Sequence, residues 1–112
     1  MIKNKLTIVL MVLLALFALG HSAERLVLAE YFTNAGWPGC GPTGAQLDVF
    51  QQNNPGMFTQ ISYHVSWPGT DPYYNANTPD SEARRNYYGV NAVPDIQVDG
   101  INTSSWQSVI PA

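Results

Sequence analysis

The tetrapeptide Cys40–Thr43 holds the side chain best suited to chemistry in this sequence. Cys40 is the only cysteine among 112 residues, and Gly41, Pro42 and Thr43 follow it directly. If a helix begins here, its positive end and its free amide groups favour the thiolate of Cys40, the nucleophilic form. Thr43 would lie one helical turn away, where its hydroxyl could donate a hydrogen bond to that thiolate. Because glycine and proline surround the cysteine, we expect a reactive or partly exposed thiol, with a small buried hydrophobic side chain as the alternative.

A single thiol restricts the redox chemistry that this site can perform. Reduction of a disulfide needs a second thiolate to attack the mixed disulfide and release the product. Thr43 cannot supply it, because an unactivated hydroxyl is essentially un-ionised at neutral pH. Cys40 could therefore form mixed disulfides with low-molecular-weight thiols or partner proteins, and an external thiol would have to reset it.

His64 is the residue that could join Cys40 in binding a metal. Two ligands are too few for a structural zinc site, and the sequence shows no evident third ligand. We therefore expect a solvated or hydrogen-bonded histidine, no metal site and no cofactor. Strand alternation places His64 on the face opposite Tyr63 and Val65.

The elements that must position these residues begin with a strand, a helix and a second strand. Leu26–Phe32 is a β-prone apolar run of the kind buried on both faces of a sheet. Apolar residues within Thr43–Asn53 follow helical spacing, and Asn53–Gly56 ends that helix. Ile61–Val65 alternates as a strand does. The proline- and asparagine-rich segment Trp67–Thr78 predicts a long loop.

A second helix is predicted over Pro79–Tyr88. Thr78 suits the N-cap, proline suits the first turn, and Gly89 suits the C-cap. Asp80 precedes Arg84 by four residues, so we expect these two side chains to pair on the helix surface.

The last part of the chain predicts one more strand and a short helix. Asp95–Val98 alternates briefly, and Asp99-Gly100 is a tight-turn signal. Ser104 or Ser105 could cap a final helix of about one turn. Strand–helix–strand alternation implies a parallel pair, and hence an α/β domain with a small central sheet flanked by helices.

The N-terminal segment predicts export. Two lysines within the first five residues precede Leu6–Leu19, an apolar run of about 14 residues, and small residues follow at Gly20–Ala23. This order is typical of a secretory signal peptide, which we place at residues 1–23, with cleavage near Ser22 or Ala23. The alternative is an uncleaved anchor, but the run is shorter than the ~20 apolar residues of a membrane span. We expect residues 24–112 to form an exported domain that is periplasmic, outer-membrane-associated or extracellular, without a membrane span.

The charge balance argues against nucleic acid as a partner. Without the two N-terminal lysines, three arginines remain against eight acidic residues, hence a net charge of −5. So few cations cannot neutralise a row of phosphates.

Three segments together resemble the thioredoxin-like superfamily. They are the strand Leu26–Phe32, the tetrapeptide Cys40–Thr43 opening a helix, and Val93-Pro94 ahead of a strand. In that family the second segment carries the redox cysteines and the third carries a cis-proline that faces them. Three further segments are similar to a branch found in exported and outer-membrane-associated bacterial proteins: Tyr63–Gly69, Asp71–Tyr73 and Ala83–Val90.

The resemblance implies a thioredoxin-like fold and a peptide groove. Pro94 would lie against Cys40 and leave the backbone of Val93 free to pair with an extended peptide, while Trp37 and Trp67 would contribute to the same surface. The alternatives are a trans-proline that starts an edge strand and aromatic rings that merely cover a small core. Thr43 stands where the family usually has its second cysteine. The last strand and helix are short or missing, which predicts a fragment or a minimal domain.

Two functions remain open at this point. The first is a monothiol thioredoxin-like oxidoreductase, with Cys40 as nucleophile, Thr43 as thiolate partner and Pro94 shaping the groove. The second is a non-catalytic thioredoxin-like module that binds proteins, or a piece of a larger cell-surface protein. The sequence does not specify the substrate or the oligomeric state.

Overall fold

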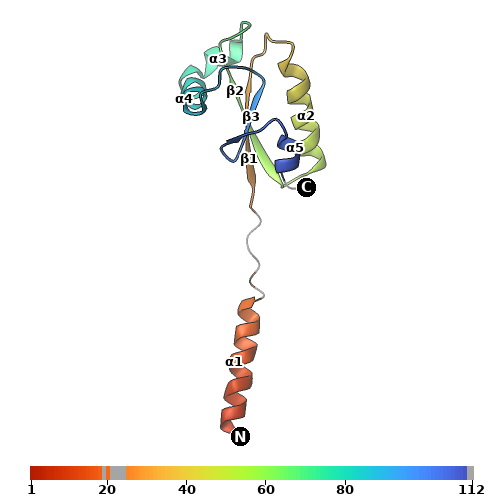
Figure 1. Cartoon of the computed structure of the whole chain (residues 1–112), viewed down its shortest axis with the longest axis vertical. Helices are drawn as coiled ribbons and strands as arrows, with labels where there is room; N and C mark the ends of the chain where they lie inside the picture. Colours follow the sequence, from red (N-terminus) through yellow and green to blue (C-terminus); the bar gives the residue numbers. More distant parts are fainter. Residues whose placement is uncertain (19, 21–24, 111–112) are drawn as a thin grey trace.

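The computed structural model describes residues 1–18, 20 and 25–110. The predicted cleavage position near Ser22 or Ala23 lies outside these residues. Figure 1 shows the order of the elements along the chain, which is α1 (Ile2–Ala18), β1 (Val27–Thr33), α2 (Cys40–Asn53), β2 (Phe58–His64), α3 (Pro72–Ala76), α4 (Thr78–Tyr88), β3 (Asp95–Val98), β4 (Ile101–Asn102) and α5 (Trp106–Val109).

The strands form one mixed sheet of four strands in the order β2-β1-β3-β4. β1 and β2 are parallel, in a register that runs from Val27 opposite Phe58 to Thr33 opposite His64. β3 pairs antiparallel with β1 on its other side, and β4 pairs antiparallel with β3. The predicted parallel pair and the α/β class with a central sheet flanked by helices are confirmed.

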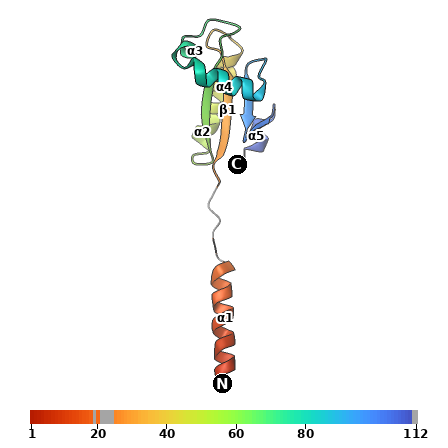
Figure 2. The same cartoon turned by 90° about the vertical axis from the view of Figure 1, so that its left-hand side faces the viewer.

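Helices cover both faces of the sheet. α2 and α5 lie on one side, while α3 and α4 lie on the other (Figures 1 and 2). The larger core, on the α2 side, contains alternate residues of β1 together with side chains from the other elements: Val27, Ala29, Tyr31, Leu47, Phe58, Ile96, Val98, Trp106 and Ile110. The smaller core, on the α4 side, is built around Phe32, Val65 and Val90. The period of two along β1 therefore divides its side chains between two layers.

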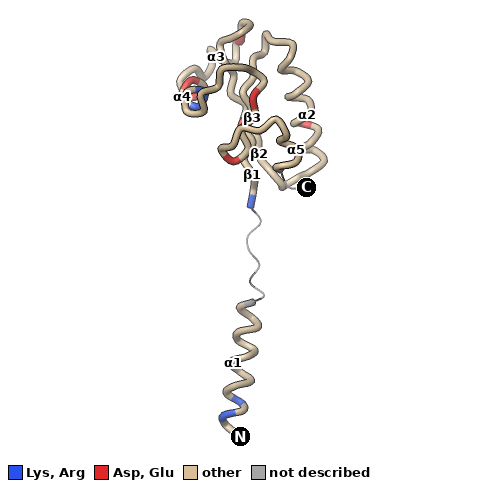
Figure 3. The backbone as a smooth tube through the Cα atoms, viewed as in Figure 1, with Lys and Arg blue, Asp and Glu red and all other residues tan. Residues whose placement is uncertain are grey.

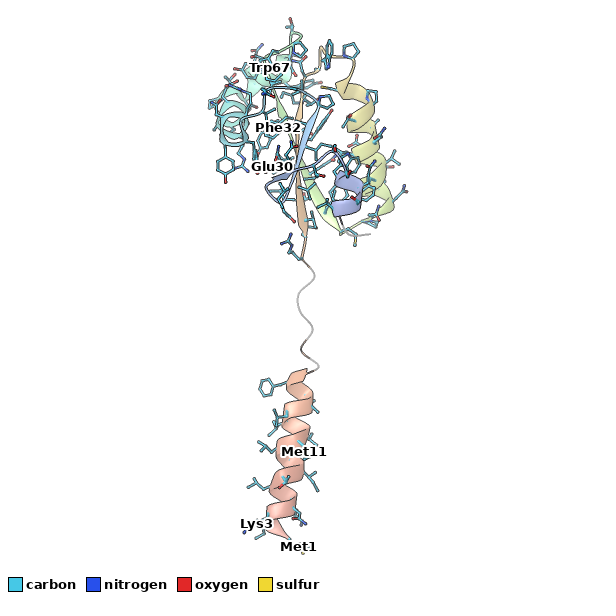
Figure 4. The ribbon with its side chains drawn as sticks, in the orientation of Figure 1. Met1, Lys3, Met11, Glu30, Phe32 and Trp67 are labelled. Atoms are coloured by element: carbon cyan, nitrogen blue, oxygen red, sulfur yellow. The ribbon has the colours of Figure 1, made fainter. Side chains whose placement is uncertain are left out.

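A buried ion pair joins β1 to α4. The Glu30 carboxylate is buried and accepts hydrogen bonds from Arg84 Nε (2.8 Å) and from the Tyr88 hydroxyl. Burial together with Glu30 raises the pKa of Tyr88 to about 12, so this phenol remains a donor. The prediction that Arg84 pairs with Asp80 is wrong, because Arg84 pairs with Glu30. In Figure 4, Glu30 and Phe32 both lie on the side of α3 and α4.

α2 begins at Cys40, so the prediction that the tetrapeptide Cys40–Thr43 opens a helix is confirmed. Gly39, just before it, already has helical dihedrals (φ −66°, ψ −22°). The predicted loop Trp67–Thr78 contains the short helix α3. Asp71 caps α3 by accepting hydrogen bonds from Tyr73 N and Tyr74 N, and proline occupies the first turn.

The C-terminal end of α4 is as predicted, but its N-terminal end is not. Gly89 ends the helix in the left-handed conformation (φ 65°), as expected of a C-cap glycine. Thr78 is not the N-cap: it is the first residue of α4, and its hydroxyl donates to Tyr74 O of α3 (2.9 Å). Because α4 follows α3 after a single residue, the Thr78 hydroxyl reaches a carbonyl of the preceding helix instead of capping its own.

The C-terminal elements are present and short. Asp99 (φ 48°) and Gly100 (φ 84°) form the predicted tight turn between β3 and β4. β4 has two residues and α5 has four. Ser105 precedes α5 but its side chain makes no capping hydrogen bond, so α5 is held by the burial of Trp106 and Ile110 in the α2-side core.

α1 is an exposed apolar helix whose basic residues lie at its N-terminal end (Figure 3). No helix formed by the described residues combines the length and the apolar character that crossing a membrane requires.

Candidate functional site

Cys40 is the first residue of α2, and its side chain is buried. Only 3% of the residue is exposed, and Sγ accepts a hydrogen bond from the backbone N–H of Asn34 (3.4 Å). The expectation of a partly exposed thiol is therefore wrong. The glycine and proline residues around Cys40 do not leave its thiol exposed, because the loop before α2 bonds to the sulfur through Asn34 N. The same loop bonds to the backbone of Cys40, whose N–H donates to Trp37 O (3.0 Å).

Cys40 nevertheless lines an open cavity of about 530 Å³. The cavity lies between the start of α2, the loop before it and the ends of β1 and β2. Cys40 and His64 both line it, as does the ring of Trp37, which is 45% exposed. A volume of this size accepts a small molecule or a single peptide side chain.

Tyr31 fixes the first turn of α2 above the sheet. Its hydroxyl donates to Cys40 O (2.6 Å) and accepts from Thr33 Oγ1 (3.1 Å). Burial raises the pKa of Tyr31, so the phenol stays protonated and keeps its role as donor. Gly44 passes this ring closely, since a Cβ on Gly44 would lie 3.4 Å from Tyr31 Cε1.

His64 is hydrogen-bonded to a buried carboxylate. Its Nδ1 lies 2.7 Å from Asp71 Oδ2, and the Asp71 side chain is completely shielded from solvent. Burial opposes ionisation of Asp71, but hydrogen bonds from the Ala35 amide, from His64 and from the Tyr74 amide outweigh it and lower its pKa. Asp71 is therefore an anion that accepts the Nδ1 proton, and Nε2 is the ring nitrogen left for other partners.

Asn34 connects the loop before Cys40 to the loop after His64. Its amide nitrogen donates to Val65 O and Gly69 O (both 2.8 Å), and its Oδ1 accepts from Gly36 N (3.0 Å) and Gly69 N (3.2 Å). We call the segments 34–39 and 65–71 the paired loops. Their backbones are so close that a Cβ on Gly36 would lie 2.8 Å from Thr70 O. The second of them contains a cis Trp67–Pro68 bond.

Thr43 and Pro94 line a different cavity, of about 340 Å³, beside β3 and α5. The Val93–Pro94 bond is cis, as predicted. Among the described residues Thr43 makes no hydrogen bond to Cys40, so the geometry gives no support for Thr43 as the thiolate partner.

The structure does not bring the residues of the predicted peptide surface together on one side of the sheet. Trp37 lies at the Cys40 cavity, whereas Trp67 and Val93 are half-buried and pack against the small core on the α4 side. Figure 4 shows Trp67 near α3, on the opposite side of the sheet from α2. The rings of β2 and α4 form part of that core: Phe32 stacks on Tyr63 (5.3 Å between centroids) and meets Tyr88 edge-on.

Two residues of the site were missed by sequence reasoning, Asn34 and Asp71. The pair Asp71-Pro72 is a helix-start signature, and it could have shown Asp71 as a capping residue. Nothing in the sequence pattern shows that the same carboxylate also holds His64. No group of three or more histidine, cysteine, aspartate or glutamate side chains in the described part of the chain could hold a metal ion.

The arrangement places a cysteine and a histidine in one cavity, with a buried carboxylate bonded to the histidine, and these groups are suited to thiol chemistry. No known protein family, no curated protein and no solved structure matches this chain.

Proposed function

We propose that this protein is an exported thioredoxin-like domain in which Cys40 performs monothiol thiol–disulfide exchange. The observation that carries the proposal is the position of Cys40, at the first residue of a helix and at the border of a cavity that also contains His64. The parallel β1–α2–β2 unit, with the cysteine at the head of its helix, supports the thioredoxin-like assignment.

The reaction has one step at this protein. The Cys40 thiolate attacks one sulfur of a disulfide R–S–S–R, a new bond forms between Cys40 Sγ and that sulfur, and the other half leaves as a thiolate that takes up a proton. Cys40 is the only cysteine in the sequence, so an external thiol must break the mixed disulfide. The partners are low-molecular-weight thiols and their disulfides, or thiols of other proteins.

The burial of Cys40 limits which disulfides react. A disulfide must enter the cavity that Cys40, Trp37 and His64 line before it can react. Small disulfides therefore react faster than the surface disulfides of folded proteins. Location outside the cytoplasm is part of the proposal, supported by the basic and then apolar sequence of α1.

The test is formation of a glutathione adduct on the native chain. Oxidised glutathione is added to the 112-residue protein, and the adduct is followed by mass spectrometry at several times. We expect one adduct per chain, lost in Cys40→Ser and released by a reducing thiol. A native chain that forms no adduct, while the unfolded chain does, contradicts the proposal.

A second candidate is a thioredoxin-like module that binds proteins without catalysis. The observation that favours it is the 3% exposure of Cys40, which is typical of an inert packing residue. The glutathione experiment separates the two candidates, because a binding module keeps its thiol unreactive until it unfolds.

A further inference from the structure

We propose that His64, held by Asp71, takes the proton of Cys40 and balances the charge of its thiolate, so that the three residues act as one unit. This inference rests on the proposed function, and it assigns a role to two residues that the thioredoxin-like resemblance does not involve. The observation behind it is that Cys40, at the start of α2, and His64, at the end of β2, line one cavity, while His64 is bonded to the buried Asp71.

The sheet register places His64 on the face of the sheet that α2 covers, the face on which Cys40 lies. Thr33, at the end of β1, is opposite His64, at the end of β2. Side chains alternate along strands, so Tyr31 and His64 face the same side as α2. The contact of Tyr31 with Cys40 O and the common cavity lining of His64 and Cys40 agree with this placement.

Two consecutive backbone amides link the sulfur to the histidine–aspartate pair. Asn34 N donates to Cys40 Sγ, and the next amide, Ala35 N, donates to Asp71 Oδ2 (2.8 Å). The same Oδ2 is bonded to His64 Nδ1. Neighbouring amides of one loop therefore bond to the sulfur and to the carboxylate that holds the imidazole, and Asn34 itself fixes the loop.

His64 is the basic group of this cavity. The other titratable side chains that line it are Cys40, Tyr31 on β1 and Asp48 on α2, and Tyr73 of α3 lies against the His64 ring at 4.9 Å. Asp48 accepts a hydrogen bond from Gln60 Nε2 (2.7 Å). The cavity lining contains no lysine or arginine among the described residues. A thiolate formed at Cys40 therefore has the imidazolium of His64 as its positive partner within the cavity.

The proposed step conserves protons and electrons. The proton of the Cys40 thiol moves to Nε2 of His64, and the thiolate attacks a small disulfide to form a new sulfur–sulfur bond. The departing thiolate takes the proton back from Nε2. Asp71 keeps the Nδ1 proton in place throughout, so that Nε2 is the nitrogen that exchanges.

The experiment measures the rate of reaction of the full native chain with oxidised glutathione and with iodoacetamide, from pH 6 to about pH 9.5. The variants are His64→Gln, His64→Ala and Asp71→Asn. Asp99→Asn is the matched control, because Asp99 also accepts a backbone N–H, from Leu28 (3.0 Å), but lies outside the cavity. Circular dichroism establishes that each variant is folded.

We expect His64→Gln to lower both rates at pH 7 at least about tenfold. This is less than the roughly 10²–10⁴-fold that general acid–base catalysis typically contributes. The difference should fall below about threefold above pH ~9, where a free thiol ionises without help. Added imidazole should restore the rate of His64→Ala but not change that of Asp99→Asn. A purely structural role of His64 would show neither the convergence at high pH nor the rescue.

The outcomes separate the two proposals. If wild-type Cys40 forms no adduct in the native chain, both the exchange function and the role of His64 are overturned. If wild-type Cys40 reacts, and folded His64→Gln reacts equally fast at pH 7, the exchange function stands and the role of His64 is overturned. Should Asp71→Asn fail to fold, the two His64 variants and the imidazole rescue decide the matter.

Discussion

Asp71 accepts hydrogen bonds from the backbone amides of Ala35, Tyr73 and Tyr74 and from the imidazole of His64. The four bonds serve three purposes: the first holds the loop before Cys40, the next two start α3, and the last orients the histidine. A buried carboxylate with this many donors is an anion in the folded state. The fold and the candidate site therefore depend on the same side chain.

The acid sensitivity of the protein should reflect Asp71. Its pKa is lowered from the ordinary 3.8 in the folded state, so its contribution to stability is complete above that value and is lost as the pH falls through the lower, folded pKa. Asp71→Asn should be less stable than wild type at pH 6, and its unfolding free energy should depend less on pH below about 4. Urea unfolding from pH 6 to pH 2.5 measures both. Parallel curves for the two proteins would contradict this origin of the acid sensitivity.

At the scale of elements, the paired loops connect β1 to α2 and β2 to α3, beside the cavity that Cys40 and His64 line. Neither loop contains regular structure that could fix its course, and Asn34 bonds to both. Gly36 and Gly69 allow the backbones to touch, since a Cβ on Gly69 would lie 2.8 Å from the backbone of Gly36. Small residues at this crossing are thus a steric requirement of the site.

Gly36→Ala should destabilise the protein by about 1–3 kcal/mol, the usual cost of overpacking, because its Cβ would meet the backbone at Thr70. Thermal or urea unfolding measures the change.

Gly41→Ala is the matched control for that prediction. Gly41 lies in the first turn of α2, and a Cβ there meets nothing within 4 Å. The change should be neutral or stabilising by up to about 1 kcal/mol. Equal effects at the two glycines would show that the close approach of the paired loops is not what matters.

The whole molecule is organised by β1, which lies inside the sheet and supplies side chains to both layers. The α2-side core is closed at its end by the short C-terminal segment, in which Trp106 and Ile110 are buried. Phe50 of α2 meets Trp106 edge-on, with 5.4 Å between ring centroids. A helix of four residues thus completes the core of the whole domain.

Ile110→Ala should lower the unfolding free energy by about 2–5 kcal/mol, as expected for a buried isoleucine that is only 1% exposed. Val109→Ala provides the comparison at the adjacent position, where the residue is 45% exposed, and should change stability by less than about 1 kcal/mol. Urea unfolding of the two variants and the wild type measures the difference. A small effect of Ile110→Ala would mean that the C-terminal segment is not part of the folded core.

The sequence by itself determined most of the elements and some of their ends. Alternation, helical spacing, Gly89 as a C-cap and the Asp99-Gly100 turn are local properties, because each depends on a few neighbouring residues. The parallel β1–β2 pair also followed, since a helix between two strands restricts how they pair. Local signals failed where two helices adjoin, at α3 and Thr78.

Only the tertiary structure decided the surroundings of each functional side chain. Arg84 pairs with Glu30, 54 residues away, instead of Asp80 on its own helix. Cys40 is buried beneath its own loop and shares its cavity with His64, while Thr43 and Pro94 lie at another. These relations depend on strand order and on the crossing of the paired loops, and both bring together residues that are distant in the chain. The local pattern around Cys40 could indicate a thiol at the head of a helix, but not the histidine that lines the same cavity.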